Sequence, residues 1–133
     1  MSTFALVGCA QRDTTAAGPA YLMCRAQSDF ATSWERATQE ADVALILSPD
    51  YGLVHPEEVV RPGDGGLGDE RWQENPEAWL ARIQRELLTL RWMDAPHRWL
   101  LLGEGDWLLS VANFLRESGQ EVVPSSPERQ LNL

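Results

Sequence analysis

Short apolar runs separated by longer helical patterns constrain the fold of this chain more than any other feature. The clearest runs are Thr3–Cys9, Val43–Leu47 and Arg98–Leu102, and each is almost continuously apolar. A strand with one face in water alternates apolar and polar residues, whereas a strand covered on both faces is apolar throughout. The runs therefore predict a parallel sheet with helices on both of its faces.

The segments between these runs carry helical signals. Ser28 can cap one helix, and Asn75-Pro76 supplies a cap and a first-turn proline for a second. Asp106 can cap a third, which Gly119 ends. Each helix shows one apolar stripe. The stripes are Phe30, Trp34, Ala37 and Ala41; Trp79, Leu80, Ile83, Leu87 and Leu90; and Trp107, Leu108, Val111, Phe114 and Leu115.

The remaining segments complete a single α/β domain over residues 1–133. Gln11–Pro19 is predicted as a loop, and Glu121–Val123 as a short fourth strand. Leu53–Gly68 contains several glycines and prolines, which predicts a long ordered loop with one helical turn at Glu57–Val60. The resulting order predicts a Rossmann-like fold, a mostly parallel four-stranded sheet layered with helices.

Charge and hydropathy limit the possible partners. The net charge is −9, and all 11 basic residues are arginines. An acidic chain repels a polyphosphate backbone, so nucleic acid is a disfavoured partner, although clustered arginines could still hold one phosphate. Neither a bilayer-spanning apolar segment nor a secretory signal is present, so we expect a cytoplasmic protein with no membrane partner.

The two cysteines, Cys9 and Cys24, are too few for a disulfide framework and do not form a C-x-x-C pair. We therefore expect both to be reduced, partly buried thiols. Cys9 ends the first strand close to Arg12, which would favour its thiolate and make it a candidate nucleophile. The alternative is that Cys9 is a small apolar plug beneath the loop.

A second group of candidate site residues follows the second strand. Ligands of open parallel sheets gather beyond the carboxyl ends of the strands, where Ser48, Asp50 and Tyr51 are expected to join Cys9 and the Gly103–Gly105 turn. Asp50 could act as a general base, and Tyr51 could stack on a flat ring. Alternatively, Ser48 and Asp50 cap the turn while Gly52 supplies a positive φ. Both roles can coexist.

Other polar features give weaker signals. His55 and His97 lack metal-ligand spacing, so neither a metal nor another cofactor is expected. The run Gly63–Gly68 has no lysine after it and no strand before it, which favours a flexible loop over a phosphate loop. Trp72 lies in a polar stretch and is a candidate stacking or lid residue.

Two segments resemble a family of small uncharacterised bacterial and phage domains. Leu6–Arg12 (LVGCAQR) resembles the opening strand and loop of that family, and Ile46–Val54 (ILSPDYGLV) resembles its ILSAKYGL signature. Val60-Arg61-Pro62 with Asp64 resembles a later proline and aspartate segment. The family is itself similar, distantly, to the YaaA peroxide-stress proteins. The resemblance implies a compact α/β domain, and this chain departs from the signature at Asp50, where the family carries lysine.

These observations lead to two hypotheses. In the first, the domain is an enzyme, or a diverged enzyme, that binds a small nucleotide- or nucleobase-like ligand. Cys9 and Asp50 then carry chemistry, and Tyr51 contacts the ring. Arg12 and Arg61 hold an anionic group. Ser48, Gly52 and Asp64 complete the predicted binding residues.

In the second hypothesis, the domain is a non-catalytic, nucleic-acid-associated or stress-response binding module. A third possibility is a plain interaction domain that uses the Leu53–Gly68 loop. The oligomeric state does not follow from the sequence.

Overall fold

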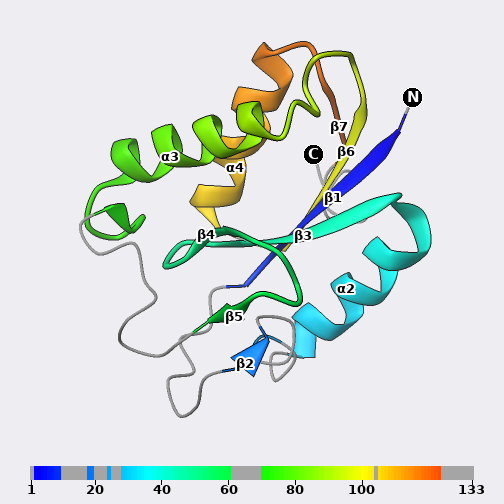
Figure 1. Ribbon diagram of the computed structural model, residues 1–133, viewed down its shortest axis with the longest axis horizontal. Coiled ribbons are helices and arrows are strands. Elements are labelled where there is room, and N and C mark those ends of the chain that lie inside the picture. Colours follow the sequence, from blue (N-terminus) through cyan, green and yellow to red (C-terminus); the bar gives the residue numbers. More distant parts are fainter. Residues whose placement is uncertain are drawn as a thin grey trace, which may run out of the picture.

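A five-stranded sheet in the order β4-β3-β1-β6-β7 forms the centre of the computed structural model (Figure 1). The structure describes residues 2–9, 18–19, 24, 28–60, 70–103 and 105–123. The parallel strands are β1 (Thr3–Gly8), β3 (Val43–Ser48), β6 (Arg98–Leu102) and β7 (Glu121–Val123). At one edge, β4 (Gly52–Val54) pairs with β3 in the antiparallel direction.

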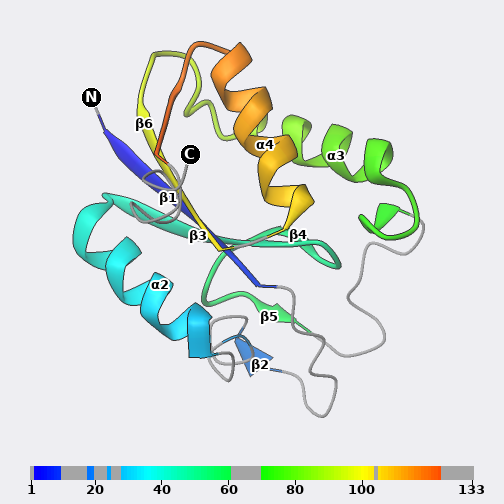
Figure 2. The ribbon, with the colours of Figure 1, turned by 180° about the vertical axis from the view of Figure 1, so that it is seen from behind.

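Helices cover both faces of this sheet (Figures 1 and 2). One face packs against α2 (Ser28–Glu40), and the opposite face packs against α3 (Pro76–Thr89) and α4 (Asp106–Glu117). A separate two-stranded antiparallel ladder joins β2 (Gly18–Pro19) to β5 (Val59–Val60). Among the described residues, no helix is long and apolar enough to cross a membrane.

The central strand β1 shows why the predicted strands lack polar alternation. Phe4 and Leu6 face α3 and α4, whereas Ala5 and Val7 face α2, and all four side chains are buried. Since successive residues of a strand point to opposite faces, a sheet covered on both sides needs apolar residues at every position. The layered α/β fold predicted from the apolar runs is therefore confirmed.

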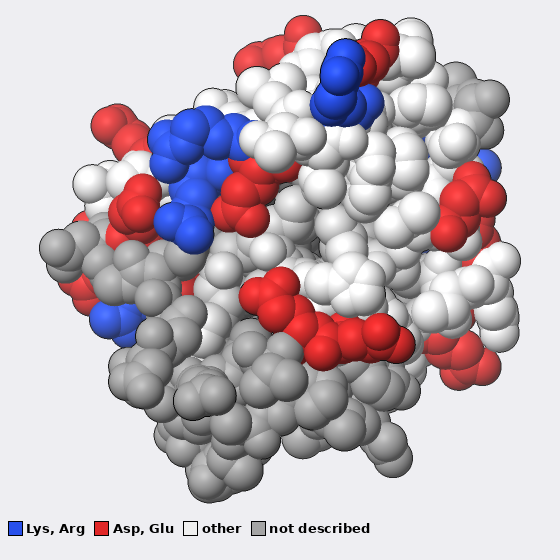
Figure 3. All heavy atoms as spheres, viewed as in Figure 1, with Lys and Arg blue, Asp and Glu red and all other residues white. Residues whose placement is uncertain are grey.

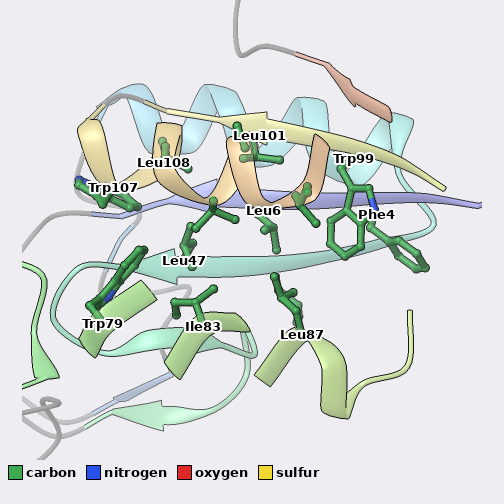
Figure 4. Close-up of a cluster of buried hydrophobic side chains, with 14 residues drawn as sticks. Phe4, Leu6, Leu47, Trp79, Ile83, Leu87, Trp99, Leu101, Trp107 and Leu108 are labelled. Carbon is green, nitrogen blue, oxygen red and sulfur yellow. The ribbon is translucent and has the colours of Figure 1, made fainter. Parts of the chain in front are cut away.

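Aromatic and aliphatic side chains fill the space between the sheet and α3 and α4 (Figure 4). Trp79, Ile83 and Leu87 extend from α3 toward Leu6 and Leu47 of the sheet. These five side chains are fully buried. Burial of a large apolar side chain stabilises a fold by about 1.5–3 kcal/mol, so the predicted stripe on α3 anchors this helix to the sheet.

The predicted N-terminal cap is confirmed for α3 and wrong for α4. Asn75 caps α3 as expected, because its Oδ1 accepts a hydrogen bond of 3.1 Å from the backbone N–H of Ala78. The prediction for Asp106 was wrong. Gly105 occupies the cap position of α4, with φ +126°, and makes no side-chain cap hydrogen bond, while Asp106 is the first helical residue.

The segment predicted as one long loop contains two short strands where it is described. Leu53 and Val54 belong to β4, and the helical turn expected at Glu57–Val60 is wrong because Val59–Val60 forms β5. In β4, Leu53 pairs with Leu47 and Gly52 pairs with Ser48 across a tight turn. The turn returns the chain along β3, so these residues gain backbone partners that their short apolar run did not predict.

Candidate functional site

Successive strands join the sheet on one side of β1 and then on the other, so the strand order reverses between β1 and β6. After β1 it passes through α2 to β3 on one side, and after β6 it passes through α4 to β7 on the other. Ligands of doubly wound sheets bind outside the carboxyl ends of the strands at such a switch point. We call the rim formed by the ends of β1, β3 and β6 the carboxyl edge.

Two glycines bring the backbones of β1 and β6 close together at this edge. A Cβ atom on Gly103, which has φ +130°, would lie 3.3 Å from Cα of Gly8. A Cβ atom on Gly8 would lie 2.7 Å from Cη2 of Trp107, so a larger residue there would push against the start of α4. Glycine is needed at both positions because the backbone conformation or the neighbouring ring leaves no space for a side chain.

The turn after β3 is held by its own serine. Ser48 Oγ accepts hydrogen bonds of 3.1 Å from the backbone N–H groups of both Asp50 and Tyr51. Gly52 follows with φ +80°, the left-handed conformation that glycine adopts without steric cost. The capping role considered for Ser48 and the positive φ expected at Gly52 are both confirmed, and Ser48 is buried in that role.

Tryptophans on the α3 and α4 side of the sheet hold the same turn in place through hydrogen bonds and ring contacts. Trp79 Nε1 donates a 3.1 Å hydrogen bond to the carbonyl of Ser48, and the backbone N–H of Trp72 donates one of 3.0 Å to the carbonyl of Pro49. The Trp72 and Trp79 rings meet edge to face at 5.4 Å, and Trp79 meets Trp107 similarly at 6.2 Å. Trp72, which we considered as a stacking or lid residue, therefore packs against the core.

Asp50 and Tyr51 lie in this turn, which runs from Ser48 to Gly52. Asp50 is buried, with 6% of its surface exposed, and Tyr51 is half-buried and packs against the core cluster on the α2 side. The end of β1 lies beside the end of β3, since the backbone N–H of Cys9 donates a 3.0 Å hydrogen bond to the carbonyl of Leu47. The ends of β1, β3 and β6 therefore converge, as the topology predicted.

The cysteines differ from our expectation. Cys9 and Cys24 form a disulfide bond, so the prediction of two reduced thiols is wrong for this structure. The prediction failed because the topology brings a residue just after β1 against a residue 15 positions further along the chain. In this oxidised form Cys9 has no thiolate, and it is buried on the α2 side of the sheet. Its assignment as a nucleophile would apply only to the reduced protein.

Other predicted site residues lie outside the described part of the chain. These are Arg12, Arg61 and Asp64, together with the Gly63–Gly68 run and the central residue of the Gly103–Gly105 turn. The described carboxyl edge therefore consists of the glycine pair, the Ser48–Gly52 turn and the disulfide. Across the described residues, no three His, Cys, Asp or Glu side chains gather closely enough to hold a metal ion.

A groove of about 590 Å³ lies away from the carboxyl edge, between α3 and the neighbouring strands β3 and β4. We call it the α3 groove. Its lining includes Val43, Leu53, Arg82, Arg85 and Glu86. Sequence reasoning missed the polar members on α3. Their signal was present, because positions 82, 85, 86 and 89 follow helical spacing beside the apolar stripe.

Electrostatics in the α3 groove centre on Arg82. Its Nε lies 3.1 Å from Glu86 Oε1, and its Nη1 lies 3.3 Å from Glu70 Oε1. Burial raises the pKa of the Glu86 carboxyl above its ordinary value, although the Arg82 guanidinium opposes this. The raised pKa of Glu86 therefore reflects the partial burial of this one side chain.

The fold and the carboxyl edge define an open, doubly wound α/β domain with glycine-lined strand ends. A model for a family of unknown function, DUF6884, matches residues 4–125, and the chain belongs to this family. The match covers nearly all of the sequence and confirms the expected membership of an uncharacterised domain family. No curated protein and no solved structure matches the chain.

Proposed function

We propose that the domain binds a small nucleotide- or nucleobase-like ligand at its carboxyl edge. The observation that carries the proposal is the approach of Gly8 and Gly103 at the switch point between β1 and β6. Trp107 and Leu108 occupy the space that a Cβ atom would need at Gly8 and Gly103, so the two glycines let α4 begin directly against these strand ends. Doubly wound sheets bind their ligands at this position.

The neighbouring side chains favour the base part of such a ligand over its phosphates. Asp50 lies in the Ser48–Gly52 turn, and Asp106 lies in the first turn of α4. Carboxylates accept hydrogen bonds from ring N–H and amino groups but repel phosphate oxygens. Tyr51 supplies an aromatic ring at the same turn. Any phosphate of the ligand would then be held by Arg12 and Arg61, as the sequence predicts.

A thermal-shift screen with nucleotides, nucleosides and free bases tests this proposal. A ligand at 100 times its dissociation constant stabilises the folded state by about 2.7 kcal/mol, which raises the Tm of a domain of this size by several degrees. We expect the largest shifts from bases and nucleosides. The shift should fall in Asp50→Asn, which keeps the shape of the side chain, and persist in Asp94→Asn, an exposed carboxylate elsewhere.

Chromatography of the same incubations measures turnover. Conversion of a ligand that stops in Asp50→Asn, while binding remains, would assign Asp50 the role of general base. Conversion only after reduction of the disulfide, and its loss in Cys9→Ser, would assign a nucleophilic role to Cys9. If no member of the three ligand classes shifts the Tm, the proposal of a nucleotide or nucleobase site fails.

The distant resemblance to the YaaA peroxide-stress proteins supports a second candidate, a nucleic-acid-associated binding module. The resemblance rests on Leu6–Arg12 and on Ile46–Val54, and the second segment contains the end of β3, the turn after it and β4. The net charge of −9 weighs against it. A fluorescence-anisotropy titration with single- and double-stranded DNA and RNA at low salt tests it, and no change in anisotropy at micromolar protein would remove this candidate.

A further inference from the structure

We propose that the α3 groove is a second binding site, for a small molecule with an apolar body and a single carboxylate. This site is separate from the carboxyl edge, because its floor comes from the first half of β3 and its wall from the second half of α3. The inference does not depend on the nucleotide-like ligand proposed above. It rests on the shape, apolar floor and charge distribution of the groove.

The floor of the groove is apolar and built on regular structure. Val43, Leu45 and Leu53 come from β3 and β4, on the face of the sheet that α3 covers. Trp92 lies at one end, where its ring stacks on Phe4 with centroids 4.5 Å apart and an angle of 6° between the planes. Strands and a stacked indole keep the floor in place without a ligand, which lowers the entropy cost of binding.

The groove has the size of a small-molecule site. Its volume of about 590 Å³ falls within the range of about 300–1,000 Å³ that is usual for ligand pockets. Such pockets are mostly apolar and carry a few polar groups that fix the orientation of the ligand. The α3 groove has this composition, since its charged groups are concentrated on the helical wall.

Arg85 is the cation in this wall that can best accept a new partner. Arg82 is already held by Glu70 and Glu86 at 3.3 and 3.1 Å. Arg85 has one long ion pair, 3.8 Å between its Nη2 and Oε2 of Glu70, and its side chain is 66% exposed. A carboxylate can therefore approach the Arg85 guanidinium without displacing a short ion pair, and a guanidinium can bind it in a bidentate fashion.

The opposite rim carries negative charge and so gives the ligand a direction. Glu57 and Glu58 are exposed in the turn after β4, next to His55 of the groove lining. Figure 3 shows arginines interspersed with acidic residues over α3, a largely uncharged central surface, and a continuous group of acidic residues below it. Glu70 and Glu86 offset Arg82 on the α3 rim, so a monocarboxylate would be attracted there by Arg85 and repelled by the acidic rim. This asymmetry favours an anionic head at Arg85 and an apolar tail along the floor.

The experiment uses 8-anilinonaphthalene-1-sulfonate as a fluorescent anion and decanoate as the competing carboxylate. We expect saturable fluorescence enhancement with the folded protein and displacement by decanoate. N-phenyl-1-naphthylamine, which lacks the anionic group, should bind more weakly. Arg85→Gln should weaken decanoate competition about tenfold, the typical effect of losing a charged hydrogen bond.

Three variants of the full chain make the result specific. Leu53→Asn should also weaken binding, because it places an amide in the apolar floor. Arg116→Gln removes an equal charge from α4 and should leave binding unchanged. Asp50→Asn should leave it unchanged as well, which separates this site from the carboxyl edge. Circular dichroism confirms that each variant is folded.

Several results would overturn the proposal. Equal affinity for the charged and neutral probes would exclude recognition of the anion, and full affinity in Arg85→Gln would exclude this arginine. A stable dimer in light scattering, broken by Leu53→Asn and blocking both probes, would show that a second copy of the chain occupies the groove instead.

Discussion

Trp79 and Ser48, 31 positions apart in sequence, are joined by a 3.1 Å hydrogen bond from the buried indole Nε1 to the backbone carbonyl. The bond links the first turn of α3 to the turn that carries Asp50 and Tyr51. A core tryptophan therefore has a second role, because it fixes the position of the carboxyl edge relative to the helical layer.

We predict that Trp79→Phe destabilises the protein by about 2–4 kcal/mol. Phenylalanine leaves a cavity at a fully buried position and removes the donor to the Ser48 carbonyl. Urea unfolding measures the loss. Trp72→Phe is the matched control, since Trp72 is only half-buried and should cost less. Equal losses in the two variants would show that the hydrogen bond to Ser48 adds little stability.

A second buried hydrogen-bond group lies at the opposite end of the sheet. Gln120 Oε1 accepts from Trp99 Nε1 at 2.9 Å and from the backbone N–H of His97 at 2.8 Å, while its Nε2 donates to the carbonyl of Ala95 at 3.2 Å. We predict that Gln120→Leu costs about 1–3 kcal/mol, because it leaves buried donors without an acceptor.

The comparison for this variant is Gln39→Leu on the exposed surface of α2. It makes the same chemical change without burying an unpaired group, so its unfolding midpoint in urea should match that of the wild type. A Gln120→Leu protein as stable as Gln39→Leu would mean that the three hydrogen bonds contribute no net stability.

The sequence predicted the elements whose stability comes from burial. In β1, β3 and β6 every interior position is apolar, and α3 carries both a cap at Asn75 and a stripe through Ile83. These signals are local, so they can be recognised without knowledge of the fold. The convergence of the strand ends followed from topology alone.

The features that were missed depend on tertiary contacts. β4 has three residues, and it becomes a strand only because Gly52 turns the chain back along β3. The disulfide depends on the placement of Cys24 beside Cys9, which the spacing of two cysteines does not determine. The α3 groove arises where a helix leaves part of a sheet face uncovered, and the polar side chains of its wall were not predicted as site residues.

Reduction of the Cys9–Cys24 disulfide should lower stability by about 3 kcal/mol, the loop-closure value for the 15 residues that separate the two cysteines. Thermal unfolding with and without a reductant measures this change. The double variant Cys9→Ser/Cys24→Ser should be insensitive to the reductant. If mass spectrometry finds both cysteines alkylated in denatured protein that has not been reduced, the disulfide does not form. Disulfides are uncommon in reducing compartments.

Glu86 provides a prediction with a definite sign of pH dependence. Its folded-state pKa is raised above the ordinary value of 4.5, first by burial and also by Glu58, against the opposing effects of Arg82 and Arg85. A raised pKa means that ionised Glu86 destabilises the folded state relative to its protonated form. The favourable contribution of protonated Glu86 to the free energy of unfolding is complete below pH 4.5. It is lost as the pH rises through the folded-state pKa of Glu86.

We therefore expect Glu86→Gln to have a higher Tm than the wild type at pH 7, with the difference shrinking as the pH falls toward 4.5. The amide keeps the size of the side chain and avoids the cost of a poorly solvated charge. Glu77→Gln, an exposed glutamate in the first turn of the same helix, is the control and should show no such gain. A lower Tm for Glu86→Gln at pH 7 would mean that the ion pair with Arg82 outweighs the desolvation of Glu86.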